Sequence, residues 1–141
     1  MDTVEVVEVQ CDGGSRGNPG PAAIGAVVLD ATVDPPVLLA SISECIGIAT
    51  NNVAEYRAVI EALRAAREYS PRLIRVRADS QLVIRQLEGR YKVKNEGLRP
   101  LYEEARLLLQ EFDEVDLGHI RREYNVDADA LVNAALDAAR G

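Results

Sequence analysis

The chain has 141 residues, 48% of them hydrophobic and 28% charged, and its 16 basic and 23 acidic residues give a formal net charge of −7. These values are typical of one globular domain, expected here over residues 1–141. No apolar run is long enough to span a membrane and the N-terminus lacks a signal-peptide charge pattern, so we expect a cytoplasmic protein with no membrane partner. Cys11 and Cys45 lie in apolar, strand-like runs, which predicts two buried, reduced thiols and no zinc site.

Apolar residues predict three strands in the first third of the chain, at residues 4–11, 22–30 and 37–46. Turn-rich links at 13–21 and 31–36 join them. We therefore expect an antiparallel meander.

A carboxylate, Asp12, closes the first predicted strand, and glycines, Asn18 and Pro19 follow it. Glycine has no side chain and tolerates positive φ, so such a turn lets a ligand or another backbone segment approach closely. An Asp-Gly pair after a strand is also typical of an ordinary hairpin turn.

The period of the apolar residues then changes, and a helix is predicted at 52–69. Two more strands are expected at 73–78 and 115–121. The remaining helices are predicted at 80–88, 98–112 and 126–139. This order describes an α/β domain with a mixed five-stranded sheet, three antiparallel strands plus two parallel ones, flanked by helices.

Glu55 lies at the start of the first predicted helix. It can complete a capping box if Asn51 or Asn52 caps this helix. However, Glu55 shares a helix face with Val59 and Ala62, which indicates that it points toward the sheet.

Two further acids, Asp79 and Asp129, also stand near predicted helix starts. Asp79 can cap the helix that follows it, as can Ser80. Asp129 suits the positive end of the last helix, and Asp127 suits it equally well.

The four acids gain a joint meaning if the first and fourth strands are parallel neighbours. Asp12 and Asp79 then emerge at one sheet edge, where ligands of open α/β sheets bind, and Glu55 and Asp129 enter near helix N-termini that can face it. Four converging carboxylates repel one another unless they bind cations, and oxygen ligands favour Mg²⁺ or Mn²⁺. Two such ions can activate a water molecule and stabilise the leaving oxygen of a phosphodiester.

The acids belong to four longer groups of residues: Asp12-Gly13-Gly14-Ser15 with Gly17-Asn18-Pro19-Gly20; Thr50-Asn51-Asn52-Val53-Ala54-Glu55; Asp79-Ser80-Gln81; and Arg122 with Asn125, Ala128-Asp129 and Leu131. On these groups the chain resembles type 1 ribonuclease H over nearly its whole length. The resemblance implies the ribonuclease H-like fold and a monomer. It also implies hydrolysis of the RNA strand of an RNA–DNA hybrid, leaving 5′-phosphate and 3′-hydroxyl ends, with Mg²⁺ as cofactor and Mn²⁺ as a substitute.

The family's four metal-binding catalytic acids carry over to Asp12, Glu55, Asp79 and Asp129. The resemblance favours Asp129 over Asp127 because Asp129 comes four residues after Asn125 and directly after Ala128.

The resemblance also implies a set of substrate-binding residues. Amides suit this task because they donate to and accept from ribose hydroxyls and minor-groove base edges without fixing a sequence. Thr50 matches a position that holds a DNA-strand phosphate, and turn or cap chemistry is the alternative for the set. Its predicted members are Asn18, Thr50, Asn51, Asn52, Gln81, Lys94 and Asn125.

Two departures from the family stand out. Residues 88–98 join two helices directly where many members carry a basic protrusion. The single histidine, His119, falls inside the fifth predicted strand, and we interpret it as structural, with Arg121, Arg122 or Glu123 as candidates for the role of the family's loop histidine.

Three alternatives to a hybrid-specific nuclease stay open. They are a nuclease of the same fold directed at double-stranded RNA, a non-catalytic hybrid-binding module, and the detached nuclease domain of a larger protein. The net charge of −7 also speaks against nucleic-acid binding, although binding depends on local rather than net charge.

Overall fold

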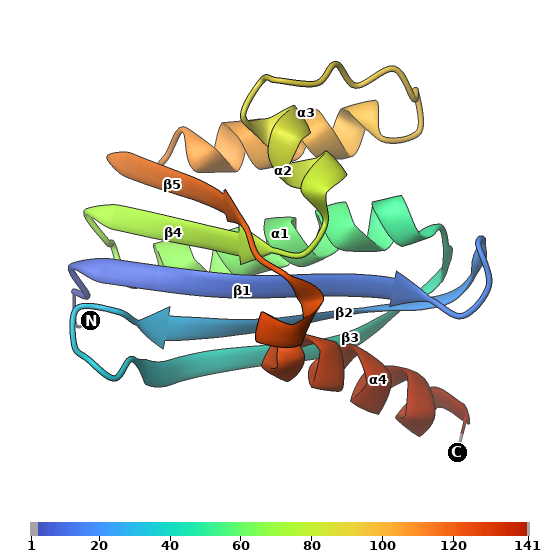
Figure 1. Cartoon of the computed structure of the whole chain (residues 1–141), viewed down its shortest axis with the longest axis horizontal. Coiled ribbons are helices and arrows are strands. Elements are labelled where there is room, and N and C mark those ends of the chain that lie inside the picture. Colours follow the sequence, from blue (N-terminus) through green and yellow to red (C-terminus); the bar gives the residue numbers. More distant parts are fainter. Residues whose placement is uncertain (1–2, 141) are drawn as a thin grey trace.

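The computed structural model describes residues 3–140, in which helices cover both faces of a single five-stranded sheet (Figure 1). The elements in chain order are β1 Val6–Ser15, β2 Gly20–Asp30, β3 Val37–Ala49, α1 Asn51–Arg67, β4 Leu73–Ala78, α2 Gln81–Leu87, α3 Arg99–Leu109, β5 Glu114–His119, the 3₁₀ helix η1 Arg122–Tyr124, and α4 Val126–Arg140. The predicted order is confirmed, and only η1 was not expected. None of the helices in residues 3–140 has the combination of length and apolar character needed to cross a bilayer.

The strands lie in the order β3-β2-β1-β4-β5. β2 is antiparallel to both β1 and β3, whereas β4 is parallel to both β1 and β5. The mixed sheet of three antiparallel and two parallel strands is therefore confirmed. In the β1–β4 ladder, Cys11 pairs with Ala78 at the carboxyl end of β4.

Two hydrophobic layers hold the helices on the sheet. On one face, α1 packs against β1 and β2, and α3 lies beside α1 and packs against it (Figure 1). Tyr56, Val59 and Leu63 of α1 are fully buried in this layer. On the other face, α4 lies across β2 and β3, where Val132 and Leu136 pack on Ala23 in a smaller cluster.

Side-chain caps fix where α1 and α2 begin. The backbone N–H of Val53 donates to Thr50 Oγ1 at 3.2 Å, so Thr50 caps α1. The alternative of a capping box with Asn51 or Asn52 as the cap is therefore wrong, because both residues lie inside the first helical turn. Ser80 caps α2 in the same way, which leaves the side chain of Asp79 out of the cap.

The first strand is longer than expected. β1 continues to Ser15, and Gly13 and Gly14 pair with Ile24 and Ala23 of β2. The predicted link at 13–21 was too long, and Asp12 lies within the strand rather than closing it. Pairing with β2 overrides the weak strand preference of glycine.

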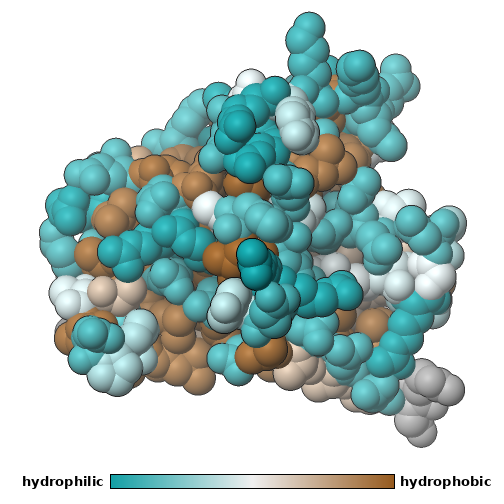
Figure 2. Space-filling model, viewed as in Figure 1, coloured by the Kyte–Doolittle hydropathy of each residue, from teal (hydrophilic) through white to brown (hydrophobic). Residues whose placement is uncertain are grey.

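The expectation that Cys45 is buried is also wrong. Both thiols are free, but only Cys11 is buried, because β3 is an edge strand and Cys45 is exposed on it. Cys45 Sγ donates to the Ala135 carbonyl of α4 at 3.1 Å. Val37 and Leu38 at the start of β3 are 54% and 58% exposed, and hydrophobic atoms reach the surface in this lower part of the molecule (Figure 2).

Candidate active site

Asp12 and Asp79 are brought together by the parallel pairing of β1 and β4. Each is the residue after one member of the Cys11–Ala78 pair, so the two carboxylates lie side by side at this end of the ladder. Asp12 is 6% exposed and the Asp79 side chain is 9% exposed. Both therefore lose most of their hydration.

Glu55 is brought to the same place by a close approach between α1 and β1. A Cβ atom on Gly13 would lie 2.2 Å from the carbonyl carbon of Ala54 and 2.6 Å from the backbone nitrogen of Glu55. Only glycine fits there, so the residue after Asp12 allows the first turn of α1 to lie against the strand. The sequence-based idea that this glycine segment admits another backbone is confirmed.

Asp129 is positioned by a second close approach, between α4 and β2. A Cβ atom on Gly25 would lie 2.3 Å from the Ala128 carbonyl oxygen. This contact fixes the first turns of α4 on the sheet, so that Asp129 lines the same cavity as Asp12. Asp127 is exposed and does not line it.

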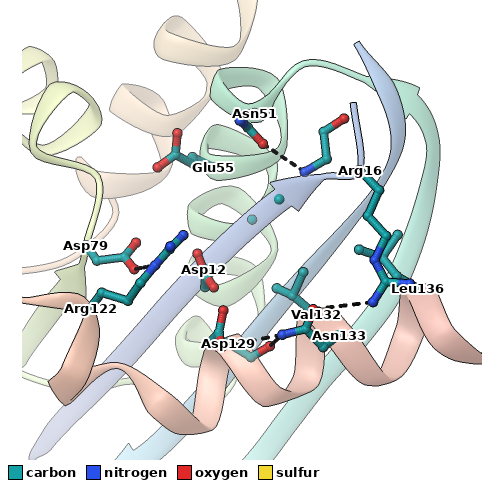
Figure 3. A pocket seen from close by; sticks show the side chains of 13 residues that line it. Asp12, Arg16, Asn51, Glu55, Asp79, Arg122, Asp129, Val132, Asn133 and Leu136 are labelled. Carbon is teal, nitrogen blue, oxygen red and sulfur yellow. Dashed lines mark hydrogen bonds and ion pairs between the residues drawn. The ribbon is translucent and has the colours of Figure 1, made fainter. Parts of the chain in front are cut away.

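All four carboxylates line one open cavity of about 400 Å³ (Figure 3). They come from β1, α1, α4 and the end of β4, and two arginines, Arg16 and Arg122, share the lining. Arg122 Nε lies 3.6 Å from Asp79 Oδ2. The acids thus meet in space although more than a hundred residues separate the first from the last.

The clustering changes the acidity of these groups. Burial, together with the charge of Asp79 and the adjoining carboxyl group of Asp129, raises the pKa of Asp12 to about 8. Burial also raises the pKa of Glu55 to about 7, although the Ser80 hydroxyl and the Arg122 guanidinium oppose this. Both shifts mean that negative charge in the cavity is poorly compensated by the protein itself.

The donor set fits a divalent cation. Asp79 Oδ2 is buried without a hydrogen-bond partner, which is costly for a carboxylate unless another cationic group neutralises it. Oxygen-only ligands suit hard cations such as Mg²⁺ and Mn²⁺. Within residues 3–140 no three acidic, histidine or cysteine side chains are grouped tightly enough to hold one ion by themselves. Water or substrate oxygens would complete the coordination, as is usual for Mg²⁺.

Comparison with known proteins places this geometry in a family. The family model described as "Reverse transcriptase-like" matches residues 10–135, which include all four acids. The crystal structure of RNase H1 from the archaeon Halobacterium salinarum is 44% identical to this chain. It covers 94% of this chain and 98% of its own, with a TM-score of 0.89. The chain belongs to the type 1 ribonuclease H family.

Two further ribonuclease H relatives define the extent of the match. LC11-RNase H1, solved in complex with an RNA/DNA hybrid, is 39% identical over 96% of this chain and 99% of its own, with a TM-score of 0.88. The bifunctional protein Rv2228c of Mycobacterium tuberculosis is 46% identical over 94% of this chain. This chain spans only 36% of the length of that mycobacterial protein.

Four of the predicted substrate-binding residues of this chain lie around the turn between β1 and β2. Asn51 Oδ1 accepts from the Ser15 N–H at 2.8 Å, and the Asn51 N–H donates to Asn18 Oδ1 at 3.1 Å. These hydrogen bonds stabilise the turn, and they leave the side-chain NH₂ groups of Asn18 and Asn51 available. Asn18, Thr50 and Asn52 line a second cavity of about 300 Å³, whereas Asn51 lines the cavity of the acids.

Gln81 and Lys94 lie apart from both cavities. Gln81 is the exposed first residue of α2, and Lys94 is exposed in the segment between α2 and α3. His119 is the exposed last residue of β5 and does not line the cavity of the acids. Of the three candidates for the role of the loop histidine, Arg122 alone lines that cavity.

The prediction that Asn125 contacts substrate is not supported by its position. Asn125 is fully buried, and its Nδ2 donates to the Cys11 carbonyl at 2.8 Å. The backbone carbonyl of Asn125 accepts a hydrogen bond from the backbone N–H of Asp129 at 3.1 Å. Asn125 therefore joins the residue before Asp12 to the first turn of α4, which is a structural task.

Sequence reasoning missed three polar residues in the lining of the active-site cavity. They are Ser15, at the end of β1, Arg16, in the link between β1 and β2, and Asn133, on α4. The spacing of Asn133, four residues after Asp129, was the available signal, since residues so spaced share a helix face.

Proposed function

We propose that this chain is a divalent-cation-dependent endoribonuclease that hydrolyses the RNA strand of an RNA–DNA hybrid and leaves 5′-phosphate and 3′-hydroxyl ends. The observation that carries the proposal is that four carboxylates, Asp12, Glu55, Asp79 and Asp129, line one cavity. Burial there raises the pKa of Asp12 and of Glu55, and Asp79 Oδ2 is buried without a hydrogen-bond partner. The hybrid-bound structure of LC11-RNase H1 supports the choice of substrate.

The four acids are the residues that would hold Mg²⁺ or Mn²⁺. Bound as a pair, such ions supply activation of a water molecule and stabilisation of the leaving oxygen of a phosphodiester. Asp12 and Asp79 provide two adjacent, nearly buried carboxylates from rigid strand ends. Glu55 and Asp129 approach from helices whose positions are fixed by Gly13 and Gly25.

The chain's other polar residues hold the duplex. Asn18, Thr50 and Asn52 surround a cavity beside the first turn of α1, where amide and hydroxyl groups can bind backbone oxygens and ribose hydroxyls. Gln81 and Lys94 add exposed contacts. Because the family's basic protrusion is missing and the net charge is −7, we infer that hybrid affinity is modest.

We also infer that the enzyme acts as a cytoplasmic monomer, with free thiols that suit a reducing compartment. A non-catalytic binding module would have no need of carboxylates that repel one another. That argument favours the enzyme over the binding-module alternative.

The test uses three labelled duplexes of one sequence: hybrid, RNA and DNA. Each is incubated with Mg²⁺, with Mn²⁺ and with chelator, and Asp79→Asn is the control variant. We expect cleavage of the hybrid's RNA strand alone, only with metal, giving 3′ ends that a polymerase extends. Undiminished cleavage in chelator, equal cleavage of duplex DNA, faster cleavage of duplex RNA, or binding without cleavage would each overturn the proposal.

A further inference from the structure

The cavity of the acids has a cationic residue on its α4 side. Arg16 lies in the short link between β1 and β2 and lines the cavity together with Asp129 and Asn133 (Figure 3). Arg122, the other arginine of the lining, is paired with Asp79 at the end of β4. The two guanidinium groups therefore lie near different acids of the cavity.

One face of α4 holds Arg16 in place. Asp129, Asn133 and Asp137 are spaced four residues apart and so share this face. Arg16 Nη2 lies 2.7 Å from Asp137 Oδ1 and donates to Asn133 Oδ1 at 3.5 Å. The Asn133 amide in turn donates to the backbone carbonyl of Asp129 at 3.1 Å and to its Oδ2 at 3.4 Å.

These contacts use only part of the hydrogen-bonding capacity of Arg16. A guanidinium group carries five N–H donors, and both interactions of Arg16 involve Nη2. Within residues 3–140, Nε and Nη1 of Arg16 have no partner, and the side chain is 35% exposed. The N–H groups of Nε and Nη1 thus stay available to donate hydrogen bonds to an oxyanion.

The ion pair with Asp137 is a poor explanation for Arg16 on grounds of stability alone. The Asp137 side chain is 66% exposed, and exposed pairs contribute little to the free energy of unfolding. Asp137 and Asn133 instead fix the direction of a flexible side chain. A guanidinium oriented in advance loses less entropy when it binds an anion.

We propose that Arg16 binds a backbone phosphate of the RNA strand next to the scissile phosphate, and that Asn133 positions both Arg16 and the Asp129 carboxylate. This inference rests on the proposed function, since it assumes a polynucleotide in the cavity of the acids. A strand whose scissile phosphate lies at the four carboxylates would bring a neighbouring phosphate to the α4 rim of the cavity. Asn133 then connects the phosphate contact to a metal-binding acid through one side chain.

The decisive experiment compares Arg16→Ala with Asp137→Asn, because each removes one partner of the same ion pair. Arg16→Ala should raise KM for the hybrid about tenfold with kcat nearly unchanged, and should make the dependence of log(kcat/KM) on log salt shallower by about one unit. Asp137→Asn keeps the guanidinium but loosens its orientation, so its KM should rise much less than that of Arg16→Ala, by about twofold, and its salt slope should equal that of the wild type. Equal and unchanged KM values in both variants, with melting temperatures lowered alike, would show that Arg16 only braces α4 and would overturn the inference.

A binding measurement separates this inference from the proposed function. Fluorescence anisotropy of a labelled hybrid in chelator, without cleavage, should give a Kd about tenfold higher for Arg16→Ala than for the wild type, and a much smaller increase for Asp137→Asn. If the wild type binds the hybrid but never cleaves it, the proposed function fails while this difference still supports Arg16. If Arg16→Ala binds as tightly as the wild type, the inference fails whatever the activity.

Asn133→Ala tests the positioning role. We expect the Mg²⁺ concentration for half-maximal activity to rise several-fold, because the Asp129 carboxylate loses its donor. A lower melting temperature with an unchanged Mg²⁺ requirement would reduce Asn133 to a structural residue.

Discussion

The backbone of Ala54 lies so close to Gly13 that a Cβ atom on Gly13 would be 2.2 Å from the Ala54 carbonyl carbon. This contact joins the residue after Asp12 to the residue before Glu55. Asp12 and Glu55 are far apart in the chain, and they lie close in space because Gly13 has no side chain. The separation of the two acids is sensitive to any side chain at this position.

Gly13→Ala should therefore destabilise the protein strongly, because the backbone of α1 must move to admit a methyl group. We expect a loss of about 3 kcal/mol in the free energy of unfolding, at the upper end of overpacking effects. Gly14→Ala is the matched control, since its Cβ would meet only Val132 Cγ1 at an ordinary 3.5 Å. Urea denaturation of both variants checks this, and equal losses would contradict the role of the contact.

The raised pKa values of Asp12 and Glu55 predict how stability depends on pH in chelator. The pKa of Asp12 is about 8 in the fold against an ordinary value of 3.8, and the pKa of Glu55 is about 7 against 4.5. Between these values the folded state holds more protons than the unfolded state, so stability falls as pH rises. The favourable contribution is complete below pH 3.8 and lost above about pH 8.

Asp79→Asn should weaken this dependence, because the charge of Asp79 is one cause of both shifts. In chelator at pH 8 the variant should melt at a higher temperature than the wild type, and the difference should shrink toward pH 5. Mg²⁺ should raise the melting temperature of the wild type more than that of the variant, since it binds the native state. Melting curves across pH, with and without Mg²⁺, test this, and a variant that melts lower at pH 8 in chelator would contradict the account.

Much of the site follows from sequence because short-range rules produce it. If β1 and β4 are parallel neighbours and β4 ends at Ala78, Asp79 must lie beside Asp12. The pairing of Cys11 with Ala78 confirms this. The inward face of α1 likewise indicated the direction of Glu55. Periodicity and strand order are both visible in the residues themselves.

Other features depend on tertiary contacts that no local pattern records. Gly13 and Gly14 extend β1 only because β2 pairs with them. The run around Cys45 has the composition of a buried strand, yet β3 lies at the sheet edge. Asn125 is polar and adjoins a loop, which is typical of an exposed residue. It is buried instead, and its Nδ2 donates to the Cys11 carbonyl at the end of the β1–β4 ladder.

Asn125→Ala should accordingly lower stability rather than substrate affinity. The variant leaves the Cys11 carbonyl without its donor inside the protein, at a cost of about 2 kcal/mol in the free energy of unfolding. KM for the hybrid should stay within about twofold of the wild type at temperatures well below melting. Gln110→Ala, at the exposed C-terminal end of α3, serves as the control. A variant of normal stability with a greatly raised KM would restore Asn125 as a substrate contact.

The segment between α2 and α3 contains the three cations best placed to replace the missing protrusion. Arg90, Lys92 and Lys94 are exposed, and Arg90 alone is in an ion pair, 3.7 Å from Glu88. Replacing all three with alanine should raise KM several-fold more than it lowers kcat, and should make the salt dependence of kcat/KM shallower. The control variant replaces three exposed arginines at or just after the C-terminal end of α1, far from the first turn of that helix: Arg64, Arg67 and Arg72. Identical KM and salt slope in the two triple variants would mean that the segment is an ordinary solvated loop.

The central claim is that four particular carboxylates act together in one cavity. Asp127 and Asp129 offer the most direct comparison, because both lie in the first turn of α4 but only Asp129 lines the cavity. The measurement is the rate of Mg²⁺-dependent cleavage of a hybrid's RNA strand by Asp129→Asn and by Asp127→Asn. We predict a loss of at least about a hundredfold in kcat for Asp129→Asn and less than a twofold change for Asp127→Asn. Equal rates in the two variants would contradict the account.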